Sequence, residues 1–284
     1  MPIASFIITF REALEAAIIV GIVAAYLKKV GNAQASRYLY LGTGLALGAS
    51  LGFAWTLQAI YGGLSGPYES LFEGSTALVA VGFLTYMIFW MTRNARKMKG
   101  QLENRLSSVL TSGQLIGVAA IAFIAVFREG IESVLFLTAF FFIDPSGTAL
   151  GVFFGLAAVT CVAVVMIKSS YRLNLHNFFK YTSMILLVFA AGLVSFAAHE
   201  LAETANSLGI SLGILGQQAF NLNVAPSSMF GEEGWLGSLL STLFGYTPSP
   251  EWIMLAVYCG YWLVIGGYLI LTYRGMTLRL VIPT

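Results

Sequence analysis

The sequence predicts an all-α polytopic membrane protein, with seven transmembrane helices arranged as an inverted 3+3 repeat plus a seventh helix. Composition favours this class, because 58% of the 284 residues are hydrophobic and 10% are charged, whereas soluble domains carry about 25% charged residues. Several apolar runs exceed the roughly 18 residues that are needed to span a bilayer. The repeat is indicated by segment 127–132 (FREGIE), which nearly copies segment 10–15 (FREALE).

Each predicted span is an apolar run that ends at polar, Gly-rich or Pro-rich residues. The first run ends at Lys28-Lys29, a Gly/Pro/Ser loop precedes the third, and residues 144–147 (DPSG) end the fourth. The predicted spans are residues 3–27, 38–61, 70–92, 113–142, 148–167, 178–201 and 252–273. Aromatic residues near span ends are typical interface anchors; they include Tyr61, Trp90, Trp252 and Tyr273.

We expect these spans to form one integral membrane domain. Its predicted parts are repeat one (1–112), repeat two (113–202), an outer connection (203–250), and the seventh helix with the tail (251–284). The segment 93–111 is polar, and the outer connection holds short apolar pieces that suit interfacial or re-entrant helices. The first run carries charged residues and has no basic region before it, so we do not interpret it as a signal peptide.

The basic residues predict the orientation of the chain. Apart from Arg11 and Arg128, every Lys and Arg lies in the loops 28–37, 93–112 and 168–180 or in the tail. The positive-inside rule then places the N-terminus outside and the C-terminus in the cytoplasm. The opposite loops are acidic, with Glu69, Asp144, Glu203, Glu232, Glu233 and Glu251. An acidic outer face attracts cations through a field that salt screens.

The repeated segment has a geometric consequence. Because three spans precede the second copy, that copy enters the membrane from the opposite side, as in secondary transporters whose site lies near the midplane. Small residues every four positions let helices approach closely. Such rows occur at Gly44, Gly48 and Gly52, and at Gly147, Gly151 and Gly155. The matched rows support the repeat.

The repeated segment also holds the main candidate site. Charges in hydrocarbon are costly, so ionisable residues inside spans usually have a function. Glu12 and Glu15 share a helix face, as do Glu129 and Glu132, and Arg11 and Arg128 each precede the second glutamate by four positions. If the two helices cross there, the four carboxylates outnumber the two guanidinium groups and suit a hard cation. The alternative is a structural salt-bridge network.

A second acidic group lies toward the predicted outer face. Glu73 opens the third span, and His199, Glu200 and Glu203 close the sixth. We expect these four residues to form an entry site for the cation. Glu73 also fits an acid favoured by the helix dipole, and His199 also fits a hydrogen-bonded interface histidine.

The residues alone therefore predict a permease for a hard cation, with Mn²⁺ or Mg²⁺ as possible substrates. A membrane-embedded di-iron enzyme is the alternative from another class. Such sites normally use Glu-x-x-His pairs, and neither His176 nor His199 lies three residues after a glutamate. We therefore expect no enzymatic activity, no permanently bound cofactor and no nucleic-acid partner. No nucleotide-binding motif is present. The sequence does not decide whether the chain forms a homo-oligomer.

Several motifs resemble one known family. They are the paired Arg-Glu-x-x-Glu segments, Phe72-Glu73-Gly74, the run 84–91 (LTYMIFWM), the run from 190 (AAGL) to His199-Glu200, and the run from 243 (LFGY) to Pro248. Nearly the whole chain is similar to the oxidase-dependent iron permease family, and within it to the bacterial EfeU-type permeases. The family's first motif usually has glycine where this chain has Ala13, which keeps the spacing of the acids.

The resemblance implies iron uptake across the cytoplasmic (inner) membrane. It implies that Glu12, Glu15, Glu129 and Glu132 bind iron, with Arg11 and Arg128 beside them. It also implies that a partner oxidises Fe(II) to Fe(III) outside, and that a periplasmic iron-binding protein and a haem peroxidase are companions.

Overall fold

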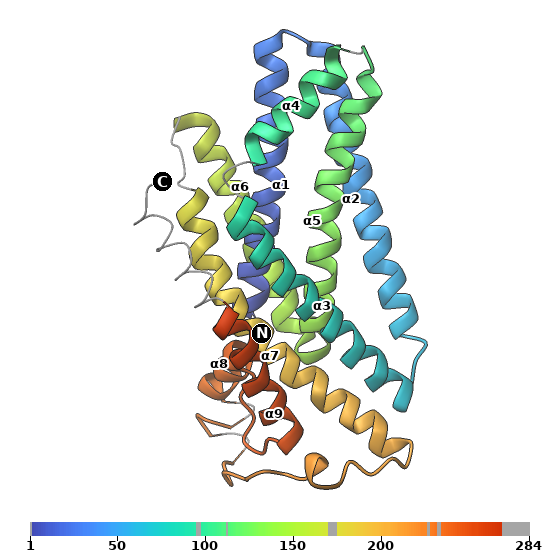
Figure 1. Cartoon of the computed structure of the whole chain (residues 1–284), viewed down its shortest axis with the longest axis vertical. Coiled ribbons are helices and arrows are strands. Elements are labelled where there is room, and N and C mark those ends of the chain that lie inside the picture. The colour runs from blue at the N-terminus through green and yellow to red at the C-terminus, as the bar shows by residue number, and fades with distance from the viewer. Residues whose placement is uncertain are drawn as a thin grey trace, which may run out of the picture. The chain divides into compact units, whose positions relative to one another are not determined.

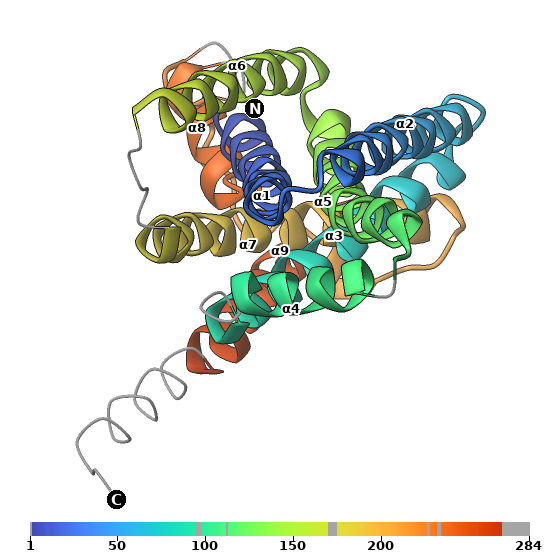
Figure 2. The same cartoon turned by 90° about the horizontal axis from the view of Figure 1, so that it is seen from above.

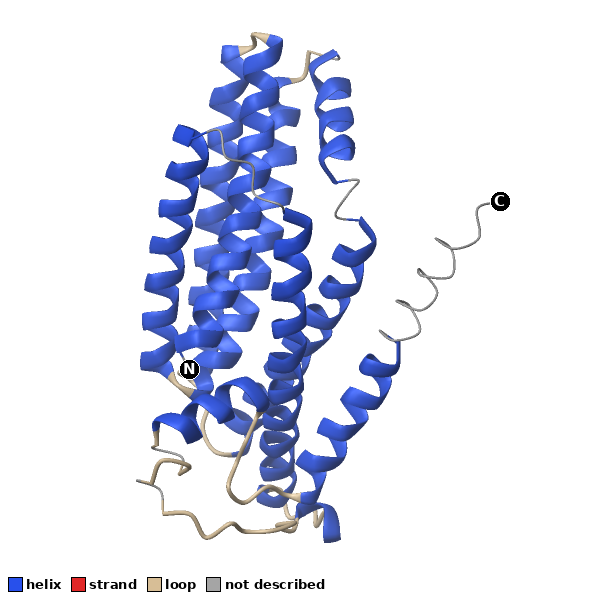
Figure 3. Ribbon diagram, turned by 90° about the vertical axis from the view of Figure 1, so that its left-hand side faces the viewer, coloured by secondary structure: helices blue, strands red, loops and turns tan. Residues whose placement is uncertain are grey.

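The computed structural model describes residues 2–94, 98–111, 113–169, 175–225, 228–231 and 234–268. Within these residues the secondary structure is helical, with no β-strand (Figure 3), so the all-α prediction is confirmed. The long helices are α1 (Pro2–Val30), α2 (Ala33–Tyr61), α3 (Pro67–Asn94), α5 (Leu115–Ile143), α6 (Pro145–Ser169) and α7 (Leu175–Ser207). The shorter elements are α4 (Met98–Thr111), η1 (Gly213–Gly216), α8 (Trp235–Phe244), α9 (Trp252–Tyr261) and the π-helix η2 (Trp262–Gly266).

Four helical stretches are long and apolar enough to cross a membrane. They are Gln34–Tyr61, Pro67–Trp90, Pro145–Val165 and Tyr181–Ser207. Helices α1 and α5 have 29 residues each, which is about 44 Å at 1.5 Å per residue, but each carries three charged residues near its middle. The described part of the predicted seventh span is helical to residue 268, and residues 269–273 lie outside the described residues. The seven-span topology stays a prediction.

Local sequence explains where the long helices begin. Helices α1, α3 and α6 each start on a proline, whose fixed φ suits the first helical position and whose missing N–H is not needed there. The Asn32 side chain accepts a hydrogen bond from Ala35 N at 3.1 Å and so caps α2. Asp144 accepts one from Gly147 N at 2.9 Å and does the same at the start of α6.

The polar segment 93–111 contains a helix that the sequence reading did not predict. Helix α4 buries Leu106 completely in a cluster with residues of α1, α2 and α5. Leu102, Val109 and Leu110 pack against the same cluster. These leucines and the valine recur at helical spacing, so they were the signal for an amphipathic helix in a charged segment.

The chain divides into two compact units, and each is described by itself. Unit 1 comprises residues 1–64 and 82–187, and unit 2 comprises residues 65–81 and 188–284. The division cuts α3 and α7, so both helices contribute to both units. It does not follow the predicted repeat boundaries at 112 and 202, and the single integral domain stays a prediction.

In unit 1 the helices of the two predicted repeats pack against each other in exchanged pairs. Helix α1 of the first repeat packs along α6 of the second, and α5 of the second packs along α2 of the first (Figures 1 and 2). Helices α1 and α5, which carry the charged segments, also pack against each other. The two charged helices are therefore neighbours, and each has its other flank covered by the opposite repeat.

Glycines allow both of these exchanged pairs to approach closely. A Cβ at Gly42 of α2 would collide with the backbone of Ala119 on α5, and a Cβ at Gly130 of α5 would collide with the Ser50 hydroxyl on α2. On α6, a Cβ at Gly151 would lie 2.5 Å from Pro2 O, and one at Gly155 would lie 2.8 Å from Thr9 Cβ of α1.

The predicted glycine row on the second span is wrong as a packing surface. A Cβ at Gly44, Gly48 or Gly52 would meet nothing within 4 Å. The close contacts of α2 come from Gly42 and Ser50, which lie on another face of the helix. The row on α6 does serve as expected, because Gly151 and Gly155 both contact α1.

In unit 2 the first part of α3 packs against the second part of α7. A Cβ at Gly74 would lie 3.0 Å from Leu201 Cγ and 3.1 Å from Glu200 Cβ. The connection that follows α7 holds η1 and α8, and α8 is capped by Gly245, whose φ is 66°. Gly245 lies against Gly192 of α7. Trp252 N donates to Gln217 O at 3.1 Å, which ties the start of α9 to the end of η1.

Candidate metal centre

Five charged side chains lie buried between α1 and α5 in unit 1. Their exposed fractions are 0% for Arg11, 1% for Glu12, 2% for Glu15, and 4% for Glu129 and Glu132. Each segment falls near the middle of its apolar helix. The helical spacing turns the acids of each segment to one side, and the contact between α1 and α5 brings the two sets together.

Three of the four predicted glutamates converge. Glu12, Glu15 and Glu129 each offer a carboxylate oxygen, and these oxygens lie within 4.8 Å of one another. They come from two helices that are more than one hundred residues apart in the sequence. Three ionised carboxylates buried at this distance repel one another strongly, so positive charge nearby stabilises them. Glu132 is not part of this triad, and its Oε1 accepts a hydrogen bond from Arg128 Nε at 2.9 Å.

Arg11 supplies part of that charge from inside the centre. Its Nη1 donates to Glu12 Oε1 at 2.5 Å, and its Nη2 lies 3.0 Å from Glu15 Oε1. The second contact is an ion pair whose angle does not suit a hydrogen bond, so Nη2 has no hydrogen-bond partner within the described structure. Arg11 therefore binds both glutamates of its own helix.

Arg128 lies in a different environment. Its Nε donates to Glu132 Oε1 at 2.9 Å and lies 4.0 Å from Glu129 Oε1. Its Nη2 lies 2.8 Å from Met87 Sδ, and its Cζ lies 4.5 Å from the centre of the Trp90 ring. The side chain is 37% exposed. The second arginine is therefore at the edge of the centre, supported by α3.

Several carboxylate oxygens of the centre are orphaned. Glu12 Oε2, Glu129 Oε2 and Glu132 Oε2 are buried and have no hydrogen-bond partner among the described residues, and Glu15 Oε1 has the ion pair with Arg11 but no hydrogen bond. A buried carboxylate oxygen without a donor is costly. Oxygen ligands of this kind are those that hard, highly charged cations prefer. A cation within reach of the triad would satisfy the oxygens and offset their charge.

Ala13, which stands at the usual glycine of the first motif, packs beside the centre. It contacts a cluster formed by Leu14, Ile18 and Val159, against which Trp90 also packs. The matching Gly130 of the second motif instead lies against Ser50. The different neighbours explain why a methyl group fits in α1 but not in α5.

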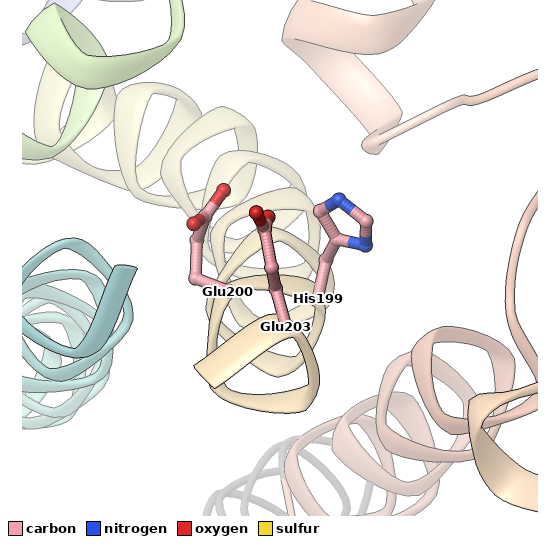
Figure 4. A group of neighbouring side chains, drawn as sticks. All are labelled: His199, Glu200 and Glu203. Atoms are coloured by element: carbon pink, nitrogen blue, oxygen red, sulfur yellow. The ribbon is translucent and has the colours of Figure 1, made fainter. Parts of the chain in front are cut away.

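A second group of potential ligands lies on α7 in unit 2. His199, Glu200 and Glu203 project to the same side of the helix, with the Glu203 carboxylate between the other two side chains (Figure 4). One ligand atom from each lies within 4.8 Å of the others. Glu73 is outside this triad, but the next residue, Gly74, packs against the Cβ of Glu200.

The sequence reading missed three residues that contact these groups. Glu251, at the start of α9, places Oε1 3.5 Å from His199 Nδ1. Met87 and Trp90 contact Arg128, although Trp90 was expected to be an interface anchor. The signal for Met87 and Trp90 was their place in the run 84–91, three residues apart on α3 and thus on one face. No short-range pattern links Glu251 to His199.

Comparison with known proteins identifies similar chains. A family model described as the iron permease FTR1 family matches residues 3–273. The chain is 35% identical over 256 residues to "Ferrous iron permease EfeU" of Yersinia pestis, covering 89% of this chain and 88% of that protein. It is also 35% identical over 256 residues to "Putative inactive ferrous iron permease EfeU" of Escherichia coli K12, covering 89% and 90%.

An archaeal protein is similar over a greater length. "Uncharacterized protein" of Archaeoglobus fulgidus is 36% identical over 273 residues, which is 96% of both chains. No solved structure matches the chain.

Proposed function

Because the chain belongs to the iron permease FTR1 family, whose members are transporters and not enzymes, we propose a path for iron. On this proposal, iron crosses the membrane through the buried carboxylate centre of α1 and α5. Glu12, Glu15, Glu129 and Glu132 serve as ligands, and Arg11 and Arg128 balance the charge when the centre is empty. The observation that carries this proposal is the triad of Glu12, Glu15 and Glu129, whose oxygens lie within 4.8 Å of one another.

The charge balance supports a highly charged substrate. Two guanidinium groups oppose four carboxylates, so the fully ionised centre retains two negative charges. Neutral ligands would leave a divalent or trivalent cation uncompensated in a low-dielectric interior, whereas these ligands offset its charge. The repeat supports alternating access, because rocking of one repeat against the other would open the centre first outward and then inward.

We propose that the ion carried is Fe(III), produced from Fe(II) outside the cell. The curated relatives are named ferrous iron permeases, which fits Fe(II) as the ion that is supplied. A haem peroxidase would remove the electron, and a periplasmic iron-binding protein would deliver the product. This arrangement places the chain in the inner membrane, with energy from an ion gradient or from trapping of iron inside the cell.

His199, Glu200 and Glu203, together with Glu73, form the proposed capture site. An imidazole and two carboxylates within 4.8 Å suit a transition-metal ion. Glu203 is exposed and Glu200 is buried, so an ion bound there would contact both solvent and protein. Capture would precede binding at the central carboxylates.

Isosteric substitution tests the central site. We expect Glu12→Gln and Glu129→Gln to abolish uptake of radioactive iron into proteoliposomes, because each removes a ligand charge while keeping the side-chain shape. Glu103→Gln on α4, which belongs to neither cluster, is the matched control and should transport normally. Undiminished iron uptake by correctly inserted Glu12→Gln and Glu129→Gln would refute the proposal.

A permease for another hard cation, Mn²⁺ or Mg²⁺, is the alternative within the same class. Oxygen ligands alone accept these ions as well. Competition distinguishes the two, because a tenfold excess of Mn²⁺ or Mg²⁺ should leave iron uptake almost unchanged if iron is the substrate. Inhibition by either ion to the level of added unlabelled iron would favour the alternative.

A further inference from the structure

The two arginines of the metal centre hold equivalent sequence positions but different surroundings. Arg11 has an exposed fraction of 0% and contacts both glutamates of its helix. Arg128 is 37% exposed, hydrogen bonds to Glu132 and approaches Glu129 only to 4.0 Å. Arg11 is enclosed by packed side chains, whereas the side chain of Arg128 lies partly outside them.

Arg128 forms an ion pair with Glu132, the motif glutamate that is outside the triad. Its Nε lies 2.9 Å from Glu132 Oε1, and the other oxygen of Glu132 is buried without a hydrogen-bond partner in the described structure. A cation bound by Glu12, Glu15 and Glu129 would repel the guanidinium and attract the Glu132 carboxylate. Both effects favour breaking the contact between Arg128 and Glu132.

Trp90 gives the Arg128 guanidinium a contact that does not involve Glu132. Arg128 Cζ lies 4.5 Å from the centre of the indole ring, a distance at which the ring face attracts a cation. The ring is itself held, since it packs against the cluster of Leu14, Ile18 and Val159. Met87, which is 1% exposed, contacts the same guanidinium through Sδ. These contacts come from α3 and do not depend on Glu132.

We propose that Arg128 is a displaceable counter-ion and that Trp90 is the positioning residue on which it pivots. In the empty centre the guanidinium neutralises Glu132. When iron enters, the guanidinium keeps its contact with Trp90 and releases Glu132, which becomes the fourth carboxylate ligand. When iron leaves, Arg128 returns to Glu132 and prevents rebinding. This inference rests on the proposed function of the centre, and it assigns a role to the run 84–91.

The decisive measurement is the effect of Trp90 on apparent iron affinity, with and without Arg128. Without the indole, the guanidinium keeps only Met87 Sδ and the carboxylates as partners, so it competes with iron more strongly. We expect Trp90→Leu to raise the KM for iron uptake about tenfold, the size of one partly desolvated cation–π contact, with little change in maximal rate. Trp90→Phe, which keeps an aromatic face, should recover part of the affinity.

Arg128→Gln should act in the opposite direction. It frees Glu132 permanently, so we expect a lower KM and a lower maximal rate because iron is released more slowly. In the double variant Trp90→Leu/Arg128→Gln, the KM should equal that of Arg128→Gln, because Trp90 acts only through Arg128. Trp55→Leu, which removes a 74% exposed tryptophan from α2, is the control and should leave KM unchanged.

Arg128→Lys provides the same test if Arg128→Gln fails to insert. A lysine keeps the charge but lacks the planar guanidinium that contacts the ring and the carboxylate together, so the effect of Trp90→Leu should shrink in that background. An equal rise in KM from Trp90→Leu with and without Arg128 would overturn the inference. If Glu12→Gln and Glu129→Gln also abolish uptake in that case, only the role of Trp90 fails and the proposed function stands.

Discussion

The arginines of the two motif copies, Arg11 and Arg128, have different surroundings. Arg11 and Arg128 each precede a glutamate by four positions, and each forms an ion pair with it. Their surroundings differ because Trp90 and Met87 of α3 lie beside Arg128. A short repeated motif thus combines a fully buried arginine with a partly exposed one, and Arg128 has neighbours that the motif does not contain.

This difference predicts unequal costs of removing the two arginines. Arg11→Gln leaves Glu12 and Glu15 buried without a counter-charge, which costs about 3–5 kcal/mol. Arg128→Gln should cost less, because the Arg128 side chain is 37% exposed and approaches Glu129 only to 4.0 Å, so its charge is less desolvated and less tightly paired than that of Arg11. Chemical unfolding of the purified protein in detergent measures both. Equal destabilisation by the two substitutions would contradict the assigned environments.

The sequence alone identified the acidic residues of the candidate site, but not the residues that contact them. Charges inside an apolar run are visible without a structure, so Glu12, Glu15, Glu129 and Glu132 could be singled out. The contacts of Arg128 with Glu132 and with Trp90 could not be predicted, because they depend on side-chain conformation and on a ring from another helix. Glu251 is 52 residues from His199 in the sequence, and only the fold of the outer connection brings it to 3.5 Å.

Close packing at the element scale depends on which face of a helix carries the glycine. Helix α2 has four glycines at positions 42, 44, 48 and 52, and only Gly42 touches another helix so closely that a side chain is excluded. Regular four-residue spacing predicted the wrong set, because spacing identifies a face without showing what that face contacts. On α6 the same rule succeeded for Gly151 and Gly155.

A pair of alanine substitutions on α2 tests this assignment. Gly42→Ala should destabilise the protein by roughly 1–3 kcal/mol, because the added methyl overlaps the backbone of Ala119 on α5. Gly48→Ala on the same helix should be neutral or slightly stabilising, because nothing lies within 4 Å and alanine favours helix. Thermal unfolding in detergent measures both. A neutral Gly42→Ala would show that α2 and α5 are further apart than described.

Gly130→Ala tests the contact between α2 and α5 at the level of the metal centre. The added methyl would collide with the Ser50 side chain, so we expect loss of stability and of iron uptake. Because the obstacle is Ser50 Oγ and Cβ, Ser50→Gly in the same chain should restore both. Failure of Ser50→Gly to rescue Gly130→Ala would place the fault in α5 itself rather than in its contact with α2.

At the scale of the whole molecule, the asymmetry of basic residues predicts the orientation. Single cysteines introduced after removal of Cys161 and Cys259 can test it with a membrane-impermeant thiol reagent. Lys29→Cys, in the last turn of α1, should react only after the membrane is permeabilised, whereas Ser65→Cys, between α2 and α3, should react in intact cells. The reverse pattern would place the N-terminus in the cytoplasm and invert the path proposed for iron.

The exchange of partners between repeats has a consequence for biogenesis. Helix α1 is made first, but the helices that pack against it from later in the chain, α5 and α6, begin at Leu115 and Pro145. At about 5–20 residues per second, roughly 5–30 s of synthesis separate the two. During that interval Arg11, Glu12 and Glu15 have no partner from the second repeat. We therefore expect the translocon or a membrane chaperone to keep these charged residues of the nascent first repeat away from lipid until the ribosome has finished the second repeat.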